Sequence, residues 1–429
     1  KLNKTIWTDN IAKLSSHLYE QRGNLQGKSS LLMLPKNTAD VVKIVKICNK
    51  NKISIVPQGG RTGLCGGTIP AKNGQEILLS TEKMDKVIEV NKDGFYMIVQ
   101  AGCYLSLIKK IAFENNRFFP LSLPSESSCT IGGNISTNAG GAAVLKYGMT
   151  KELVEGIEVV LPNGEILNSI KNIEKDNRSF DLKYLHIGSE GTLGIITKVK
   201  IRLFPEIKKK VMAIIATNTI NNLIKFLKIT KNECYEYFSA FEINTNIGLN
   251  LINKFYNNIP IPFDNQYSWY AIVELFSYDN VNLEKKISSV ISQSLKNKII
   301  FDAIIPQNLK QYNNIWKTRE LLSEAQKLNG KSIKHDISIP IEKIPFFLKE
   351  ARKSLTGFSK NNILTFGHLA EGNLHYNISK PKTMPMSVFN KLHKKVNSNI
   401  FDIVHDLGGS FSAEHGIGLI KKKEFIKYT

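Results

Sequence analysis

Glycine-rich segments are the feature that most restricts how this chain can fold. Three of them lie in the first half of the sequence, at 57–68, 124–141 and 188–194. The first directly follows a short apolar strand predicted at 53–56, and consecutive glycines let backbone N–H groups converge on phosphate oxygens. A Rossmann loop opens a helix, whereas this segment runs through Pro70 and Gly74 to another predicted strand. We therefore expect a phosphate cradle of neither the Rossmann nor the P-loop type, with a ligand-free turn as the alternative.

Short strands and helices of mixed order surround these segments and predict an α+β fold. A helix is expected at 40–50, and strands are expected at 76–80, 96–101 and 195–203. The last of these strands alternates apolar and polar residues, and Pro205 closes the first block. Beyond it the glycine-rich loops stop, and strands alternate with helical stretches. We expect domains at 1–205 and 206–385, followed by a C-terminal helical segment at 386–429.

The composition narrows the class of protein. With 42% hydrophobic and 22% charged residues, the chain of 429 residues is of ordinary globular type. No apolar run approaches the roughly 18 residues that a membrane span needs, and the first 30 residues lack the apolar core of a signal peptide. The net charge of +21 raises nucleic acid as a partner, but the lysines are spread along the whole chain. We expect no membrane span and no nucleic acid, and keep a basic nucleic-acid-associated protein as a distant alternative.

The cysteines indicate the compartment. No two of the five lie in a CxxC spacing, which argues against a zinc finger or an iron–sulfur cluster, and their odd number suits a reducing environment. We expect a cytoplasmic protein, with peripheral attachment at the inner membrane as an alternative.

Two histidines near the C-terminus, His368 and His375, suggest a metal site. On one continuous strand their odd spacing would point them to opposite faces. If the chain turns back at 371–373, they become cross-strand neighbours with Cβ atoms about 5 Å apart, which suits two imidazoles on one metal. A catalytic zinc site needs a third protein ligand, and the segment 411–418 supplies candidates. The segment 411–418 contains a further histidine, His415. The remaining five histidines are expected to be ordinary core or surface residues: His17, His186, His335, His393 and His405.

Arg319 is notable because arginine is scarce in this chain. A guanidinium binds a carboxylate with two parallel hydrogen bonds, which lysine cannot do. A solvated helix charge that pairs with Glu320 is the alternative interpretation.

The three glycine-rich segments, with Lys146-Tyr147-Gly148 and the hairpin at 162–164, resemble the FAD-binding domain of the vanillyl-alcohol oxidase superfamily. Within it, the chain resembles the family of D-lactate, glycolate and D-2-hydroxyglutarate dehydrogenases, over about residues 34–423. The segments around Arg319 and Lys334 resemble the D-2-hydroxyglutarate group. The resemblance implies an FAD-binding domain at 1–205, a cap domain at 206–385 that binds substrate and metal through an antiparallel sheet and helices, and a C-terminal segment that returns to the flavin.

The resemblance also implies which residues bind FAD. The expected contacts are Pro57, Gly59, Gly60, Arg61, Thr62, Gly63, Gly66, Gly67, Pro124, Ser125, Thr130, Gly132, Gly133, Asn134, Thr137, Asn138, Gly140, Gly141, Tyr147, Gly148, Glu190, Gly191, Gly194, Ile195 and Ile196. Some members of the superfamily tether FAD through His or Cys. No histidine lies just before the first loop, so we expect FAD to be held without a covalent bond, with Cys129 as the alternative attachment point.

A divalent metal, expected to be zinc, is implied by the same resemblance, with His368, His375 and Glu414 as ligands and His415 as the general base. Oxidation of a 2-hydroxy acid removes a hydroxyl proton and an α-hydride. A metal at the hydroxyl lowers its pKa, histidine can take the proton near neutral pH, and the hydride is expected to pass to flavin N5. The family commonly has Gly-Asp where this chain has Ala370-Glu371, which concerns the shape of the turn.

For the substrate, the resemblance implies binding by Arg319, Ser323, Lys334 and Asn377. Arg319 fits any acid of the family, whereas Lys334 adds a second cation and favours a dicarboxylate. We expect D-2-hydroxyglutarate, with D-lactate or glycolate as the alternative.

The electron acceptor is left open by the sequence. There is no NAD loop and no cluster-binding set of cysteines, so electrons are expected to leave to an external quinone, electron-transfer flavoprotein, cytochrome or iron–sulfur subunit. A homodimer stays open beside a monomer. Relatives usually continue beyond the Glu414-His415 motif with a helix and a short tail. We expect that part either to be cut off from the sequence given or not to exist in this protein.

Overall fold

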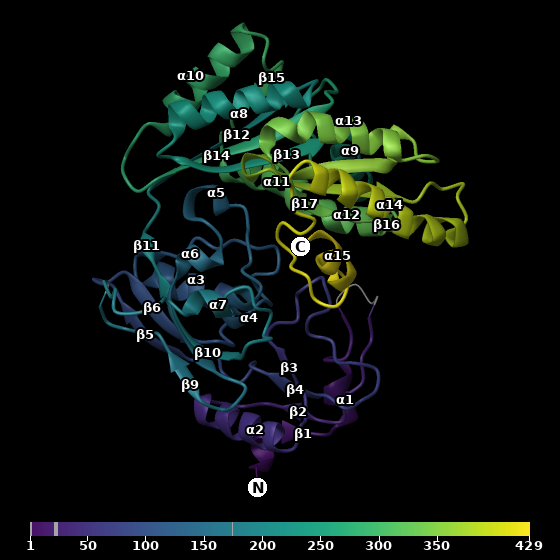
Figure 1. Cartoon of the computed structure of the whole chain (residues 1–429). Helices are drawn as coiled ribbons and strands as arrows, with labels where there is room; N and C mark the ends of the chain where they lie inside the picture. The colour runs from purple at the N-terminus through teal and green to yellow at the C-terminus, as the bar shows by residue number, and fades with distance from the viewer. Residues whose placement is uncertain (1, 21–24, 174) are drawn as a thin grey trace. The chain divides into compact units, whose positions relative to one another are not determined.

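The computed structural model describes residues 2–20, 25–173 and 175–429, and the chain divides into two compact units (Figure 1). Unit 1 comprises residues 1–141, 147–206 and 414–429, and unit 2 comprises residues 142–146 and 207–413. The C-terminal segment expected at 386–429 is therefore shared. Its long helix α14 (Met386–Asp406) belongs to unit 2, and the residues after Ala413 belong to unit 1.

Unit 1 is built on two sheets. The first has the order β1 (Trp7–Thr8), β2 (Leu32–Met33), β4 (Ile77–Ser80) and β3 (Ile55–Gln58), and β4 is parallel to both its neighbours. The second is antiparallel, in the order β5 (Val87–Asn91), β6 (Tyr96–Gln100), β10 (Ile195–Arg202), β8 (Val154–Val160) and β9 (Ile166–Asn168). The short strands β7 (Arg117–Phe118) and β11 (Phe204–Pro205) form a separate pair.

Helix α2 (Thr38–Lys50) shows how sequence pattern sets the core of unit 1. Its predicted apolar face, which includes Val41 and Ile44, is buried in one cluster with Ile77 and Leu79 of β4. Asn37 caps the helix by accepting a hydrogen bond from the N–H of Asp40 at 3.0 Å. The alternation expected for β10 does not appear as alternating burial, because this strand lies between two others and all but two of its residues are buried.

The other helices of unit 1 are short. They are η1 (Lys4–Ile6), α1 (Ile11–Ser15), α3 (Leu105–Glu114), α4 (Ile131–Ser136), α6 (Thr150–Leu153), α7 (Lys183–His186) and α15 (Lys422–Tyr428); α5 (Val144–Tyr147) spans the boundary with unit 2.

Unit 2 contains one antiparallel sheet. Its order is β15 (Asp302–Ile304), β12 (Lys209–Thr217), β14 (Trp269–Ser277), β13 (Phe238–Thr245), β18 (Ile363–His368), β19 (Asn373–Ser379) and β16 (Ser332–Ile333), and β17 (Asp336–Ser338) also pairs with β19. Helices α8 (Ile220–Cys234) and α10 (Leu283–Lys296) pack against β12 and β14 (Figure 1). The remaining elements are α9 (Asn246–Phe255), α11 (Leu309–Glu320), α12 (Leu322–Leu328), η2 (Ile341–Lys343), α13 (Ile344–Ser354), η3 (Lys360–Asn362) and η4 (Leu369–Glu371).

One face of this sheet carries the chemistry. Met212 and Ile272 project from it into a cluster with Leu249 of α9 and Ile315 of α11. Residues directly opposite each other on neighbouring strands point to the same face, and Ile272 lies opposite Glu242. This face, covered by α9 and α11, therefore carries buried polar side chains beside its apolar core.

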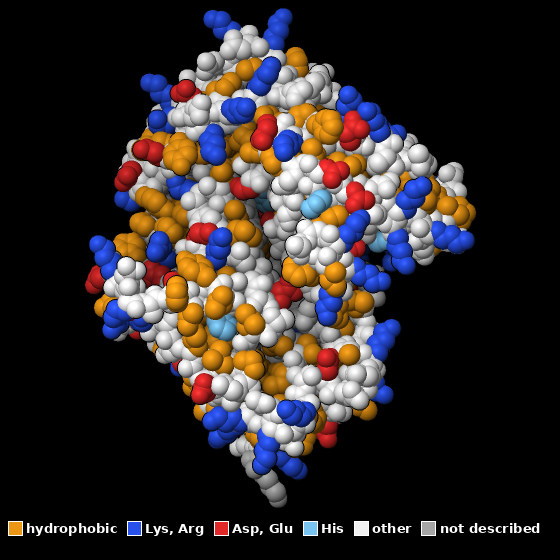
Figure 2. All heavy atoms as spheres, in the orientation of Figure 1, with side chains coloured by type: hydrophobic (Ala, Val, Ile, Leu, Met, Phe, Trp, Pro, Cys, Tyr) orange, Lys and Arg blue, Asp and Glu red, His pale blue; other side chains and the backbone are white. Residues whose placement is uncertain are grey.

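The surface bears on two of the expected partners. In the described residues, no helix is both long enough and apolar enough to cross a membrane. Figure 2 shows Lys and Arg scattered over the visible face instead of gathered in one patch. A dispersed positive charge does not favour a nucleic-acid site, which concentrates basic residues on one face.

Candidate active site

The three glycine-rich segments lie against one another in unit 1. A Cβ atom at Gly60 would overlap the carbonyl oxygen of Ser128, so the backbones of the first and second segments touch there. The third segment is joined to the second by the N–H of Glu190, which donates to the carbonyl of Ser136 at 2.7 Å. Segments far apart in the sequence thus form one continuous cradle.

Strain and an unsatisfied hydroxyl mark this cradle as a ligand site. Each loop contains a non-glycine residue with a left-handed backbone: Arg61 at φ 57°, Asn138 at 45° and Glu190 at 53°. Such residues cost on the order of 1–3 kcal/mol each and cluster at ligand clamps. Thr130 is 2% exposed, and its Oγ1 has no hydrogen-bond partner among the described residues. These residues fit the pyrophosphate of FAD, which would supply acceptors for exposed N–H and O–H groups.

Some of the predicted FAD contacts are core residues of unit 1. Tyr147 lies between the rings of Phe118 and Phe204, with centroids 5.9 and 4.8 Å away. Ile195 and Ile196 are buried at the start of β10. In the structure these side chains contribute packing behind the loops.

Glu190 has a specific role in the structure. Its carboxylate accepts hydrogen bonds from the backbone N–H groups of Ile417 at 2.7 Å and Gly418 at 2.8 Å. These two residues lie two and three positions after His415, the predicted base. Glu190 therefore anchors the loop that carries this histidine to the third glycine-rich segment, and all of these residues belong to unit 1.

His17 supports the first glycine-rich loop, a role that the sequence did not indicate. It precedes that loop and was expected to be an ordinary core histidine. Its Nδ1 lies 2.7 Å from Oε1 of Gln58 and 3.1 Å from Nη1 of Arg61, and Arg61 is also 3.7 Å from Glu82. Burial lowers the pKa of His17. Only the contact across 41 residues of sequence reveals this role, so no local pattern could have predicted it.

Cys129, the alternative attachment point for FAD, is buried. Burial raises the pKa of its thiol, and Asn134 donates to its sulfur from 3.6 Å. A thiol with a raised pKa is a poor nucleophile. All five cysteines are free thiols.

The expected hairpin of the two histidines is present, but its register differs from the prediction. In the β18–β19 ladder His375 lies opposite Phe366, not opposite His368. His368 is the last residue of β18, and η4 begins at the next position. The two histidines are therefore diagonal neighbours, with ring centroids 6.2 Å apart. The direct cross-strand pairing was wrong because the 3₁₀ turn shifts the point at which the strands begin to pair.

Gly372 explains the shape of that turn. It has φ 73°, and a Cβ atom there would overlap the carbonyl oxygen of Ile339. Both conditions require glycine. Ala370 and Glu371 lie in the preceding 3₁₀ turn, so the departure from the family's Gly-Asp is accommodated before the essential glycine.

Each histidine has a carboxylate directly opposite it on the neighbouring strand. Glu242 of β13 lies opposite His368, and Asp336 of β17 lies opposite His375. A carboxylate oxygen of Glu242 contacts Nδ1 of His368, and Oδ1 of Asp336 lies 3.8 Å from Nδ1 of His375. At His368, the carboxylate at Nδ1 favours the proton there and leaves Nε2 with a lone pair, the usual arrangement of a metal-binding histidine. At His375 the 3.8 Å separation is an ion-pair distance, longer than a hydrogen bond.

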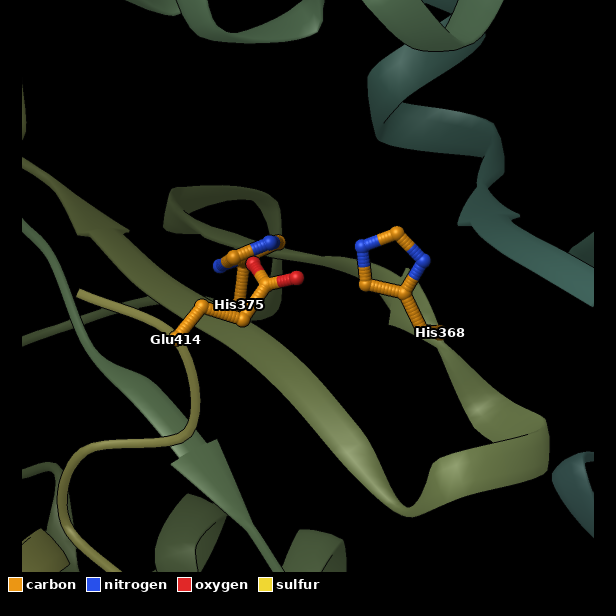
Figure 3. Close-up of side chains that lie close together, drawn as sticks. All are labelled: His368, His375 and Glu414. Atoms are coloured by element: carbon orange, nitrogen blue, oxygen red, sulfur yellow. The ribbon is translucent and has the colours of Figure 1, made fainter. Parts of the chain in front are cut away.

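Glu414 completes this group. It follows Ala413, whose N–H donates to the carbonyl of Asp336 at 3.2 Å, so the backbone of unit 2 holds it near β17. Figure 3 shows the carboxylate of Glu414 beside the ring of His375, with His368 facing them. One ligand atom from each of the three residues lies within 4.8 Å of the others. Two imidazole nitrogens and a carboxylate oxygen fit a divalent metal such as zinc.

His415 follows Glu414 and belongs to a second such group. Potential ligand atoms of Asp336, Glu414 and His415 also lie within 4.8 Å of one another. The structure thus brings the predicted base to the predicted metal ligands.

Arg319 does not pair with Glu320, the alternative that the sequence raised. Its Nε donates to Oε2 of Glu242 at 2.6 Å, and its guanidinium lies 4.9 Å from the centroid of the Phe366 ring. Its Nη1 and Nη2 make no hydrogen bond to the described residues, so both stay available to a ligand carboxylate. Burial raises the pKa of the Glu242 carboxyl, but the neighbouring His368 and Arg319 outweigh burial and hold this pKa at about 2.

The other predicted substrate residues differ in their surroundings. Lys334 is half-buried between β16 and β17, and Ser323 is exposed on α12. Asn377 is buried, where it accepts from the N–H of His335 at 3.2 Å and donates to Gln326 at 2.9 Å. The side chain of Asn377 is thus largely engaged inside unit 2.

Glu242 and Asp336 are the residues of this site that sequence reasoning missed. Glu242 is the charged residue of β13, a strand that is buried over almost its whole length, and this was a signal for it because a buried charge needs a partner. Asp336 lies two positions after Lys334, and nothing in the neighbouring sequence indicated its partner.

Comparisons with known proteins agree with the two units. Residues 29–169 match a model described as FAD binding domain, and residues 207–429 match one described as FAD linked oxidases, C-terminal domain. A protein of Oryza sativa subsp. indica named probable D-2-hydroxyglutarate dehydrogenase, mitochondrial, is 36% identical over 93% of this chain and 70% of its own length. A Schizosaccharomyces pombe protein named putative D-lactate dehydrogenase, mitochondrial, is 32% identical over 97% of this chain and 80% of its own length.

Among solved structures, a crystal structure of p-cresol methylhydroxylase with substrate bound is similar. It has a TM-score of 0.76 at 14% identity, over 100% of this chain and 89% of that chain. This likeness confirms the expected α+β fold.

Proposed function

This chain belongs to the FAD-linked D-2-hydroxy acid dehydrogenase family, and from that membership we propose that it oxidises D-2-hydroxyglutarate to the 2-oxo acid with the help of a divalent metal. FAD-dependent oxidation of a D-2-hydroxy acid follows from the family. The particular acid, the metal and the residue roles are the proposal.

The metal part of the proposal is carried by one observation. His368, His375 and Glu414 converge, and each histidine has a carboxylate opposite it. A single histidine is most often an ordinary core residue, but two imidazoles with a converging carboxylate are a ligand set that zinc prefers. A divalent ion held there would supply the positive charge that makes the substrate hydroxyl more acidic.

The protein residues then have distinct tasks. His415 takes the hydroxyl proton, for which an imidazole is suited near neutral pH. Glu190 holds the loop that follows His415 by two backbone hydrogen bonds, so the backbone next to this imidazole is fixed before substrate arrives. The cradle of glycine-rich loops would hold FAD, which would supply the hydride acceptor for this oxidation.

The choice of acid depends on the cations. Arg319 offers Nη1 and Nη2 to a carboxylate, but Glu242 already balances its charge. A preference for a dicarboxylate therefore depends more on Lys334 than on Arg319. Both residues belong to unit 2, as do the two histidines. D-Lactate oxidation is the second candidate, favoured by the S. pombe relative.

A panel of D- and L-2-hydroxy acids with an artificial dye acceptor tests this proposal. We expect D-2-hydroxyglutarate to be oxidised with a kcat/KM roughly 30-fold or more above that of D-lactate, because a monocarboxylate lacks the second carboxylate that would contact Lys334, and the loss of one partner of a buried charge pair costs on the order of 2–5 kcal/mol. A preference for D-lactate would instead establish the second candidate.

Lys334→Met should narrow that gap. Removal of the cation should lower kcat/KM for D-2-hydroxyglutarate strongly and kcat/KM for D-lactate little. The measurement is kcat/KM for both acids in the wild type and in the variant. Lys331→Met is the matched control, because Lys331 is exposed and lies three positions earlier on the same segment. An equal loss for both acids in Lys334→Met would mean that Lys334 does not read a second carboxylate.

The acceptor and the compartment stay predictions. An external quinone, electron-transfer flavoprotein, cytochrome or iron–sulfur subunit fits a chain that relies on FAD. The cytoplasm was expected from the odd number and the spacing of the cysteines, but the names of the rice and fission-yeast relatives place them in mitochondria. The interior of either compartment is reducing enough for free thiols.

A further inference from the structure

We propose that Glu242 is a positioning residue that ties the metal site to the substrate-carboxylate site, by holding His368 with one carboxylate oxygen and Arg319 with the other. This inference rests on the proposed function, because it takes His368 as a metal ligand and Arg319 as a substrate ligand. It adds a residue to which neither the sequence nor the family resemblance gave a role.

The geometry of Glu242 carries the inference. It lies on β13, directly opposite His368 of β18, and 2% of its surface is exposed. One oxygen contacts Nδ1 of His368, and the other accepts from Nε of Arg319 at 2.6 Å. All three residues lie in unit 2, so their relation is a property of that unit alone.

A single carboxylate with two different donors places both partners at once. On the histidine side it keeps the proton on Nδ1 and turns Nε2 to the ligand position. On the arginine side it occupies Nε, so Nη1 and Nη2 are left to face a ligand carboxylate. Any movement of the carboxylate therefore disturbs both sites. This explains why a charged residue is kept in a buried strand, where burial disfavours it.

Glu274 provides the contrast. It lies on the same face of the same sheet, on the adjacent strand β14, and is 4% exposed. Its carboxylate binds the hydroxyl of Tyr312, Nε1 of Trp316 at 3.1 Å and Nζ of Lys210 at 3.0 Å. It bonds neither His368 nor Arg319. Glu274→Gln is thus a matched control for the general cost of a neutralised buried glutamate in this sheet.

The first measurement is zinc affinity, by competition with a chromogenic chelator on the purified FAD-loaded protein. Glu242→Gln leaves at most one oxygen acceptor, and its amide nitrogen, a donor, faces the other donor. We expect it to weaken zinc binding by about 10- to 100-fold, the usual effect of losing a residue that orients a metal ligand. Glu274→Gln should bind zinc as the wild type does.

The second measurement separates the two functions of Glu242. Arg319→Met keeps the contact between Glu242 and His368, so it should raise KM for D-2-hydroxyglutarate and leave zinc affinity unchanged. Glu242→Gln should change both quantities. Glu242→Asp keeps the charge, but its side chain is one methylene shorter and cannot reach both partners. It should therefore restore part of either the zinc affinity or the KM for D-2-hydroxyglutarate, and not both.

A double-mutant comparison identifies the route of the effect. If Glu242 acts on the metal through His368, Glu242→Gln combined with His368→Ala should weaken zinc binding no more than His368→Ala alone. Additive losses would place Glu242 outside the path to the metal.

The outcomes also separate this inference from the proposed function. If the wild type binds zinc and oxidises D-2-hydroxyglutarate, yet Glu242→Gln behaves like Glu274→Gln in both measurements, the coupling is refuted and the function stands. If the wild type oxidises no D-2-hydroxy acid, the proposed function fails first. Loss of folded, FAD-loaded protein in Glu242→Gln leaves Glu242→Asp to decide, and zinc affinity and KM in Glu242→Asp that both match the wild type overturn the inference.

Discussion

Replacement of His415 by Asn is expected to lower kcat by about 100-fold or more, the usual scale for the loss of a general base. Asparagine keeps a polar side chain of similar size but cannot take a proton. FAD content and the flavin absorption spectrum should stay unchanged. The decisive measurement is the rate of flavin reduction by D-2-hydroxyglutarate in a single turnover.

His393→Asn is the control, because His393 is exposed on α14. It should reduce the flavin at the wild-type rate. Glu190→Gln gives an intermediate case, since it keeps His415 but weakens the two hydrogen bonds that hold the following loop. Near-wild-type flavin reduction in His415→Asn would show that another group is the base.

Removal of the metal is expected to abolish turnover while FAD stays bound. Two of the three proposed ligands, His368 and His375, lie in unit 2, and the third, Glu414, lies in unit 1 but outside the glycine-rich loops. Removal of the metal should therefore leave the residues that hold the flavin unchanged. Addition of zinc or a similar divalent ion should restore activity. Metal content by elemental analysis and the flavin spectrum report the two cofactors separately.

A ligand variant provides an independent check of the metal. His375→Ala should be purified with FAD but without stoichiometric metal, and zinc should not restore it. His393→Ala should keep both. Full activity in exhaustively stripped wild-type protein would disprove the metal requirement.

Local chemistry explains what could be predicted before the structure. The apolar face of α2 follows from the spacing of Val41, Ile44 and Val45, and burial of that face is what the structure shows. The hairpin between β18 and β19 follows from the turn residues between the two histidines. The resemblance to the family rested on runs of glycine that are contiguous in sequence. Each of these inferences depends on residues within a few positions of one another.

Register and long-range contacts could not be predicted in the same way. The histidines were expected to face each other directly, but the ladder pairs His375 with Phe366. Where pairing begins depends on the turn and on the neighbouring strands, and a shift of two residues keeps the same face. Both histidines therefore still meet on one face, and the error in register did not separate the proposed ligands.

The sequence by itself determined the family, the α+β class and the residue types of the candidate site, because motif order and glycine content are properties of the chain. Only the tertiary structure decided which charges meet. Arg319 and Glu242 are 77 positions apart and form a buried ion pair, while the neighbouring Glu320 is left out of it. The physical reason is that pairing in a sheet brings distant residues to contact distance, and burial then requires each charge to find its partner there.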